Sequence, residues 1–167
     1  MSRDRSRNKY IRKSKRVVLV TYERENKTEK NYLSNFSGRN KDYIIKPVPG
    51  NETDPVNLIR QAIQKAKDLS LDLLEDDKAY CIFDADTKPQ KNIQIDLAIK
   101  LAKENYIIPI VSVPCVELWF LLHYEYSTAI KNSKKLERYQ KQNNKKLQSV
   151  DANPYTEMYK LVEELMK

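Results

Sequence analysis

Four short apolar runs alternate along the chain with segments whose apolar residues recur at helical spacing. The runs are rich in Val, Ile, Tyr and Phe and are bounded by polar residues, a pattern typical of buried strands. An alternation of strands and helices predicts an α/β fold with a mainly parallel sheet and right-handed crossovers. The predicted strands are 17–22, 43–48, 79–84 and 106–111.

The segments between and after these strands carry the predicted helices. Asp54 followed by Pro55 indicates a helix start, because Asp accepts hydrogen bonds from the first amides and proline suits the first helical position. Residues 116–124 are apolar on all sides, which indicates a buried helix, and 128–147 is predicted as a Lys-rich helix or helical hairpin. The other predicted helices, judged from apolar spacing, cover about 29–36, 55–69, 93–102 and 155–165.

Basic residues concentrate at two places in this chain of 167 residues and formal net charge +8. Residues 1–16 hold eight Lys and Arg with one Asp, and residues 130–147 hold seven with one Glu. The rest of the chain is net acidic, which predicts an acidic domain with two basic appendages. We expect a disordered basic arm at 1–16, one α/β domain at 17–127, and a helical extension at 128–167 that packs on the same domain.

The composition excludes several classes of protein. Gly38 and Gly50 are the only glycines, so the chain has no glycine-rich loop for nucleotide phosphates, and a Walker ATPase, a kinase or a dinucleotide-binding enzyme is not expected. Cys81 and Cys115 have neither metal-binding nor disulfide spacing. No apolar run approaches the roughly 20 residues of a membrane helix, and no secretion signal follows the charged N-terminus. We therefore expect a cytoplasmic protein with no membrane contact.

Two of the predicted strands end in carboxylates. Glu23 follows strand 17–22, while Asp84 ends strand 79–84 and Asp86 follows two residues later. A sheet order of 2-1-3-4 would place these strand ends side by side, at the switch point where α/β sheets bind ligands. Asp84 and Asp86 would lie on one side of an extended segment and could share one cation. The three acids therefore predict a catalytic site for Mg²⁺ or Mn²⁺, the alternative for the Asp-x-Asp pair being a loop or capping role.

Four further residues are weaker candidates for the same chemistry. Glu25 and Glu29 are alternatives to Glu23, although an acid in a first helical turn also complements the helix dipole. Glu117 lies inside an apolar segment, where an unpaired charge is costly, so it needs an amide, a basic residue or the metal site as a partner. His123, the only histidine, is a candidate acid or base, but a lone histidine among aromatic residues is more often a hydrogen-bonded core residue.

The basic segments suit a polyanionic partner such as nucleic acid. A long, positively charged side chain is sufficient to contact a phosphate, and it does not have to recognise the bases. The alternative is that both segments are solvated and have no partner. The predicted contacts to nucleic acid, with RNA or DNA left open, are Arg12, Lys13, Lys15, Arg16, Arg24, Lys134, Lys135 and Arg138.

Taken together, these motifs resemble the RloB-like family of small Toprim-related proteins, and the resemblance covers most of the chain. The stretch from Ser112 to His123, SVPCVELWFLLH, is similar to the most distinctive signature of that family. The other segments that carry the resemblance are the basic lead 12–16, the strand that ends at Glu23, the segment 27–33 (KTEKNYL), and the Asp84-x-Asp86 strand end.

The resemblance implies a Toprim-like Rossmannoid fold of about four mainly parallel strands, with Glu23, Asp84 and Asp86 around Mg²⁺. It also implies a metal-dependent endonuclease, acting in bacterial anti-phage defence beside a partner ATPase. This chain has Arg24 where the family has glycine after the motif Glu, so Glu25 remains an alternative for the first-strand acid. The alternative function is a noncatalytic module that binds nucleic acid or the ATPase, and the oligomeric state, including a homo-oligomer, stays open.

Overall fold

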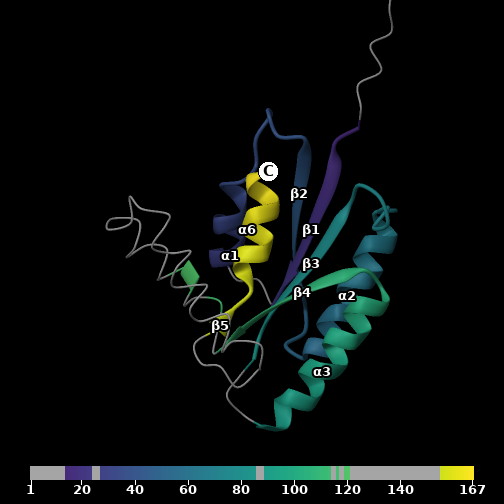
Figure 1. Ribbon diagram of the computed structural model, residues 1–167, viewed down its shortest axis with the longest axis vertical. Helices are drawn as coiled ribbons and strands as arrows, with labels where there is room; N and C mark the ends of the chain where they lie inside the picture. The colour runs from purple at the N-terminus through teal and green to yellow at the C-terminus, as the bar shows by residue number, and fades with distance from the viewer. Residues whose placement is uncertain (1–13, 24–26, 86–88, 114–115, 117–118, 121–154) are drawn as a thin grey trace, which may run out of the picture.

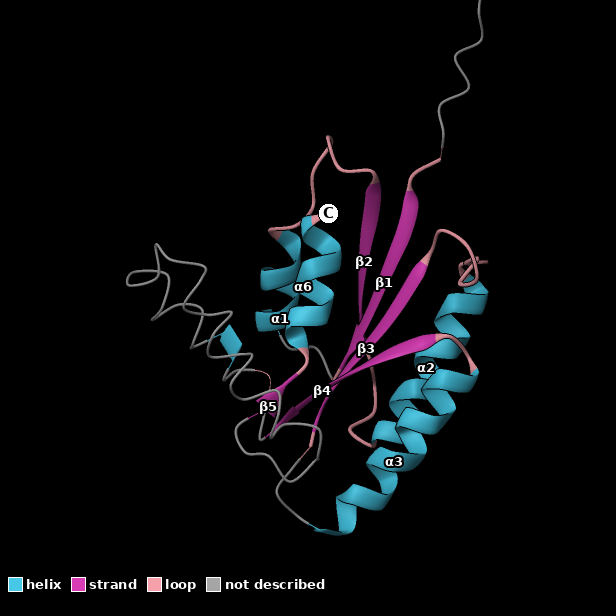
Figure 2. Ribbon diagram, in the orientation of Figure 1, coloured by secondary structure: helices cyan, strands magenta, loops and turns pink. Residues whose placement is uncertain are grey.

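A sheet runs through the centre of the molecule, with helices on both of its faces (Figures 1 and 2). The structure is a computed structural model that describes residues 14–23, 27–85, 89–113, 116, 119–120 and 155–167. Within these residues five strands form one sheet, in the order β2-β1-β3-β4-β5. None of the helices in this described part combines the length and the hydropathy needed to span a membrane.

The four long strands lie where the apolar runs predict them. The strands are β1 (Arg16–Tyr22), β2 (Tyr43–Pro49), β3 (Lys78–Asp84), β4 (Ile107–Val113) and the short β5 (Tyr155–Thr156). The helices are α1 (Lys27–Ser34), α2 (Pro55–Asp68), α3 (Pro89–Glu104) and α6 (Met158–Met166). The chain is therefore an α/β protein with a C-terminal helix, and its arrangement is that of a Rossmannoid fold.

The first four strands are all parallel, and the predicted order 2-1-3-4 is confirmed. The inner strand β1 pairs Tyr22 with Pro49 of β2 on one side and with Ile82 of β3 on the other. The chain therefore leaves β1 in one direction to form β2 and returns to the opposite side to form β3. The carboxyl ends of β1 and β3 form the switch point of the sheet, the usual place for a ligand in such folds.

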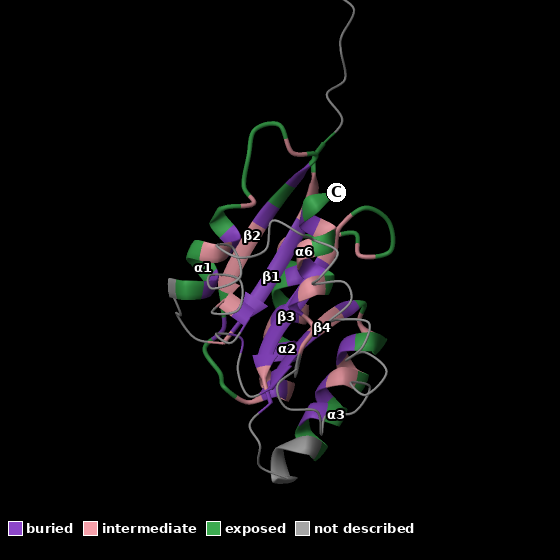
Figure 3. Ribbon diagram, turned by 60° about the vertical axis from the view of Figure 1, so that its left-hand side comes forward, coloured by how far each residue is buried: buried purple, intermediate pink, exposed green. Residues whose placement is uncertain are grey.

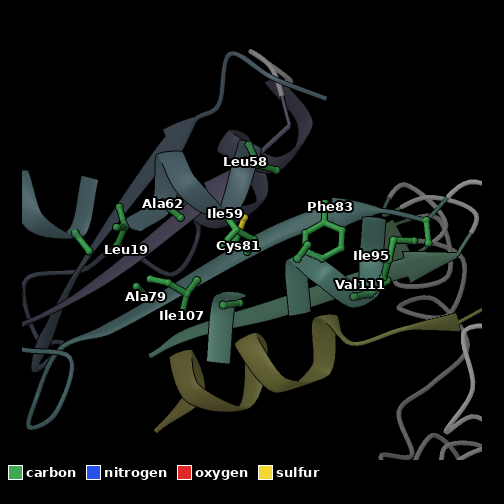
Figure 4. Close-up of a cluster of buried hydrophobic side chains, with 14 of the residues drawn as sticks. Leu19, Leu58, Ile59, Ala62, Ala79, Cys81, Phe83, Ile95, Ile107 and Val111 are labelled. Atoms are coloured by element: carbon green, nitrogen blue, oxygen red, sulfur yellow. The ribbon is translucent and has the colours of Figure 1, made fainter. Parts of the chain in front are cut away.

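Successive strand residues point to opposite faces, which gives the sheet two hydrophobic cores. Figure 3 shows that much of the strands is buried. Because parallel strands are covered on both faces, they appear in the sequence as nearly continuous apolar runs. The core under α2 and α3, shown in Figure 4, includes Leu19, Leu58, Ile59, Ala62, Ala79, Cys81, Phe83, Ile95, Ile107 and Val111. The core under α1 and α6 includes Val18, Val20, Tyr22, Leu33, Tyr80, Ile82, Trp119, Met158, Leu161 and Leu165.

The start of α2 confirms the predicted helix signal. Asp54 is the N-cap, and its carboxylate accepts a hydrogen bond of 2.9 Å from the amide of Asn57. Pro55 is the first helical residue. This end places the loop after β2 against the end of β1, where the amide of Gly50 donates a 2.7 Å hydrogen bond to the carbonyl of Tyr22.

The C-terminal helix begins later than predicted. Tyr155, expected on the helix, lies in β5 and pairs antiparallel with Val113, while Thr156 pairs with Ser112. The hydroxyls of Ser112 and Thr156 are 2.8 Å apart, and the helix α6 starts only at Met158. Without β5, the backbone N–H and C=O groups on the outer edge of β4 would lack partners, and pairing with β5 satisfies them. The spacing of apolar residues in the sequence does not indicate that this edge needs a partner.

Arg16 is a strand residue, so the predicted basic arm is one residue too long. Its guanidinium forms an ion pair with Glu164 of α6, lies 3.8 Å from the carboxylate of Asp42, and lies over the ring of Tyr43 at 5.5 Å. These contacts hold Arg16 against α6, and its predicted contact to nucleic acid stays a prediction. The rest of the predicted arm up to residue 13, the predicted helix at 128–147 and most of that at 116–124 lie outside the described residues.

Candidate functional site

Glu23 and Asp84 meet at the carboxyl edge of the sheet. Glu23 directly follows β1, and Asp84 is the last residue of the adjacent parallel strand β3. A carboxylate oxygen of Glu23, Oε1, accepts a hydrogen bond of 3.1 Å from the backbone amide of Asp84. The predicted juxtaposition of these two acids at the switch point is therefore present, and both side chains are half-buried.

Asp84 is itself held by the chain that follows β4. Its Oδ1 accepts a hydrogen bond of 2.9 Å from the amide of Val116. The next residue, Ala85, donates its amide to the carbonyl of Ser112 at 2.7 Å, so the end of β3 stays paired with β4. The amide of Trp119 donates to the carbonyl of Val116 at 2.9 Å. The Asp84 carboxylate therefore holds Val116 at the end of β3, and Val116 in turn holds Trp119.

The Glu23 charge affects the core below it. Cys81 is completely buried in the core under α2 and α3, and burial raises the pKa of its thiol above the ordinary value. The negative charge of Glu23 raises this pKa further. The carboxylate of Glu23 thus lies close enough to this core for its charge to affect the thiol.

Glu29, a secondary candidate, lies in the first turn of α1. Its side chain is only 4% exposed, which is unusual for a carboxylate. The position near the helix N-terminus favours a negative charge because the helix dipole is positive there. The described residues nevertheless contain no group of three or more His, Cys, Asp or Glu side chains arranged to hold a metal ion. Within this part of the chain the acidic edge consists of Glu23 and Asp84.

An aromatic cluster connects α1 to Trp119 and Phe120. Trp119 is 8% exposed, as expected for a core residue, and its indole Nε1 donates a 3.3 Å hydrogen bond to the hydroxyl of Tyr32. The ring of Tyr32 lies 4.7 Å from that of Phe120 and 5.4 Å from that of Phe36, measured between centroids. Burial raises the pKa of Tyr32, partly offset by the hydrogen bond from Trp119. Tyr32 is thus a neutral acceptor in this cluster.

Many of the predicted site residues cannot be placed relative to this edge. Lys15 is exposed at the opposite end of β1, where its ammonium donates a 2.8 Å hydrogen bond to the carbonyl of Arg39. The predicted residues that lie outside the described part of the chain are Asp86, Glu25, Glu117, His123, Arg12, Lys13, Arg24, Lys134, Lys135 and Arg138.

The backbone amides of Asp84 and Val116 are the part of the site that sequence analysis missed. Each donates a hydrogen bond to an acid of the edge. Every residue except proline has such an amide, so residue type carries no signal for it. The only sequence signal for the amide of Val116 is its position, three residues past the end of β4.

One model of a known protein family matches more than half of the chain. The family model described as RloB-like protein matches residues 18–128, which include all four long strands except two residues at the start of β1. No curated protein and no solved structure gives a significant match to the chain. The matched segment includes both acids of the carboxyl edge and the residues Val116 and Trp119. The chain belongs to the RloB-like protein family.

Proposed function

We propose that this protein is a Mg²⁺-dependent nuclease that hydrolyses phosphodiester bonds of RNA or DNA. The observation that supports the proposal most directly is the Glu23–Asp84 pair: two acids at the ends of adjacent parallel strands are joined at the switch point of the sheet, where the amide of Asp84 donates to the carboxylate of Glu23. Membership of the RloB-like family supports the wider proposal of a Toprim-type effector that acts in the cytoplasm, in bacterial anti-phage defence, beside a partner ATPase.

The donor chemistry at this edge fits Mg²⁺ or Mn²⁺. Both cations prefer oxygen ligands, and both described acids offer carboxylate oxygens. In the proposal Glu23 and Asp84 hold the cation, and Asp86, outside the described residues, is the third ligand. When bound, such a cation polarises a phosphate oxygen and lowers the pKa of a bound water.

The protein backbone orients both acids before any ligand arrives. The amide of Asp84 holds the carboxylate of Glu23, and the amide of Val116 holds that of Asp84. Side chains fixed in this way lose less conformational freedom when they bind, which favours affinity and correct geometry. The basic segments 1–15 and 130–147 would retain the nucleic acid through its phosphates while the acidic edge acts on one of them.

A noncatalytic module that binds nucleic acid or a partner ATPase is the second candidate. The two amide hydrogen bonds favour it, because they give Glu23 and Asp84 a structural role that requires no cation. The described residues also contain no group of three metal-binding side chains. In this case the basic segments would bind the partner, and Glu23 and Asp84 would serve only to hold the ends of β1 and β3 and residue Val116 together.

Substitution of Asp84 by Asn tests the proposal. Asn keeps a side-chain oxygen for the amide of Val116 but removes the charge, so this hydrogen bond should survive while the cation site is lost. Calorimetric titration with Mn²⁺ and Mg²⁺ should show binding to the wild type and none to Asp84→Asn. Asp68→Asn, which removes an exposed acid from α2, is the matched control and should bind like the wild type.

The same variants are then assayed for cleavage of labelled single-stranded and double-stranded RNA and DNA. The wild type and Asp68→Asn should cleave with Mg²⁺ and stop with a chelator, and Asp84→Asn should be slower by on the order of 100-fold or more. Cleavage by Asp84→Asn at the wild-type rate, or a wild type that binds neither cation, overturns the proposal. Metal-independent binding of nucleic acid that weakens steeply with salt, without cleavage, would instead support the noncatalytic module.

A further inference from the structure

The outer surface of α3 carries an exposed apolar ridge. Ile93 and Leu97 are 69% and 55% exposed, and they lie one helical turn apart on the same stripe. Leu101, partly buried against the core, continues the stripe at the same spacing. Figures 1 and 3 show α3 at the outside of its layer, with exposed residues along it. The other large apolar side chains exposed in the described residues belong to different elements: Ile44, Leu74, Tyr106 and Met166.

Two opposite charges lie along one flank of this ridge. Asp96 and Lys100 are both exposed and are also one turn apart. When two helices pack antiparallel and face to face, the same flank of each helix meets that of the other. Along one helix this flank carries Asp96 and then Lys100, and along the antiparallel partner the same two charges come in the opposite order. Each acid therefore faces a base of the other helix. The α3 surface is therefore complementary in charge to a second, antiparallel copy of itself.

The positions of the apolar side chains agree with the same arrangement. A two-fold axis at the level of Ala98 brings Asp96 level with the partner's Lys100, and Lys100 level with the partner's Asp96. The same axis places the partner's Leu97 at a level midway between Leu97 and Leu101 of the first copy. Side chains of one helix then fit into the gaps of the other, as packed helices require.

We propose that α3 is a homodimer contact, in which the ridge of Ile93, Leu97 and Leu101 packs antiparallel against the same ridge of a second copy. This contact is independent of the acidic edge and of its proposed chemistry. A contact made by one helix from each copy is small, and the net charge of +8 on each chain opposes association. The dimer is therefore weak and forms only at high protein concentration.

Sedimentation equilibrium of the full chain over a range of concentrations tests the contact. The wild type should show a reversible monomer–dimer equilibrium. Leu97→Glu places two charges in the ridge contact and should raise the dissociation constant on the order of 100-fold. Leu74→Glu is the matched control, because Leu74 is 71% exposed in the loop before β3, and it should leave the equilibrium unchanged. Circular dichroism confirms that each variant is folded.

Charge reversal tests the antiparallel orientation. Asp96→Lys and Lys100→Asp each create two repulsive pairs and should raise the dissociation constant about tenfold at low salt. The double variant Asp96→Lys/Lys100→Asp restores both attractive pairs and should recover wild-type affinity. If the protein is monomeric at every concentration, the proposal is overturned. The ridge would then belong to a different partner. A dimer that Leu97→Glu leaves intact, or a double variant that stays weak, also overturns the proposal.

Discussion

The carboxylate of Glu23 accepts a hydrogen bond from the backbone amide of Asp84, so the acid that follows β1 is attached to the end of β3. The contact joins residues 61 positions apart in the sequence. It forms because β1 and β3 are parallel neighbours with the register that pairs Tyr22 with Ile82. Glu23 therefore helps to close the edge of the sheet, in addition to its proposed role as a cation ligand.

Substitutions of Glu23 separate these two roles. Gln retains an oxygen that accepts from the Asp84 amide but loses the charge, so Glu23→Gln should match the wild-type free energy of unfolding within about 0.5 kcal/mol. It should bind Mn²⁺ at least about tenfold more weakly, because Mn²⁺ favours carboxylate oxygens. Glu23→Ala also leaves the amide without its acceptor and should lose about 1 kcal/mol of stability. Urea unfolding and calorimetry measure the two effects, and wild-type Mn²⁺ affinity in Glu23→Gln would contradict the ligand role.

The ion pair between Arg16 and Glu164 should make stability depend on pH. Burial alone would raise the pKa of Glu164, but hydrogen bonds from Arg16 and Lys167 outweigh burial and hold this pKa below the ordinary value of 4.5. A carboxyl group whose pKa is depressed in the folded state stabilises the protein above its unfolded pKa. That stabilisation is lost as the pH falls through the folded pKa. The free energy of unfolding should therefore decrease as the pH is lowered from about 5 to about 2.

Glu164→Gln should remove part of this pH dependence. Near pH 7 the variant should be about 2 kcal/mol less stable than the wild type, because the guanidinium of Arg16 loses a charged partner. Glu163→Gln, at the neighbouring exposed position on α6, is the control and should behave like the wild type. Urea unfolding at a series of pH values measures both curves, and identical slopes for the wild type and Glu164→Gln would show that the pair does not contribute.

The two glycines should respond very differently to substitution by alanine. A Cβ on Gly50 would overlap Cδ1 of Leu58, which is fully buried, and would lie 3.1 Å from the carbonyl oxygen of Tyr22. Gly50→Ala should therefore destabilise the protein by about 2 kcal/mol, because a packed core resists an added methyl group. A Cβ on Gly38 would make only an ordinary contact of 3.6 Å with Lys41, so Gly38→Ala should change stability little. Equal unfolding midpoints for the two variants would contradict this difference in packing.

Trp119 is the only tryptophan, so its fluorescence reports on the aromatic cluster. Tyr32→Phe removes the oxygen that accepts from the indole Nε1. The variant should lose about 1 kcal/mol of stability, and its emission should move to shorter wavelength because the indole loses a polar partner. Tyr106→Phe, at a position that is 60% exposed, is the control. Unchanged stability and emission in Tyr32→Phe would show that this hydrogen bond is absent in solution.

The four long strands and the start of α2 could be predicted from the sequence because their signals are local. Residues 79–83 are buried on both faces of the sheet, so every one of them is apolar or aromatic and the run is continuous. Asp54 and Pro55 act within a single helical turn, so residue type alone reveals them. The alternation of elements then restricts the topology, and the predicted order 2-1-3-4 and the meeting of Glu23 with Asp84 are both present.

The tertiary structure decided what depends on partners distant in the sequence. Arg16 has the residue type of the basic arm, and only the docking of α6 gives it Glu164 as a partner. Tyr155 has the spacing of a helix, and only the open edge of β4 makes it a strand. The backbone amide that holds Asp84 belongs to Val116, whose side chain says nothing of that role. Local pattern thus determined which segments are strands and helices, whereas long-range contacts determined the surroundings of each charged group, because those contacts exist only after the sheet has assembled.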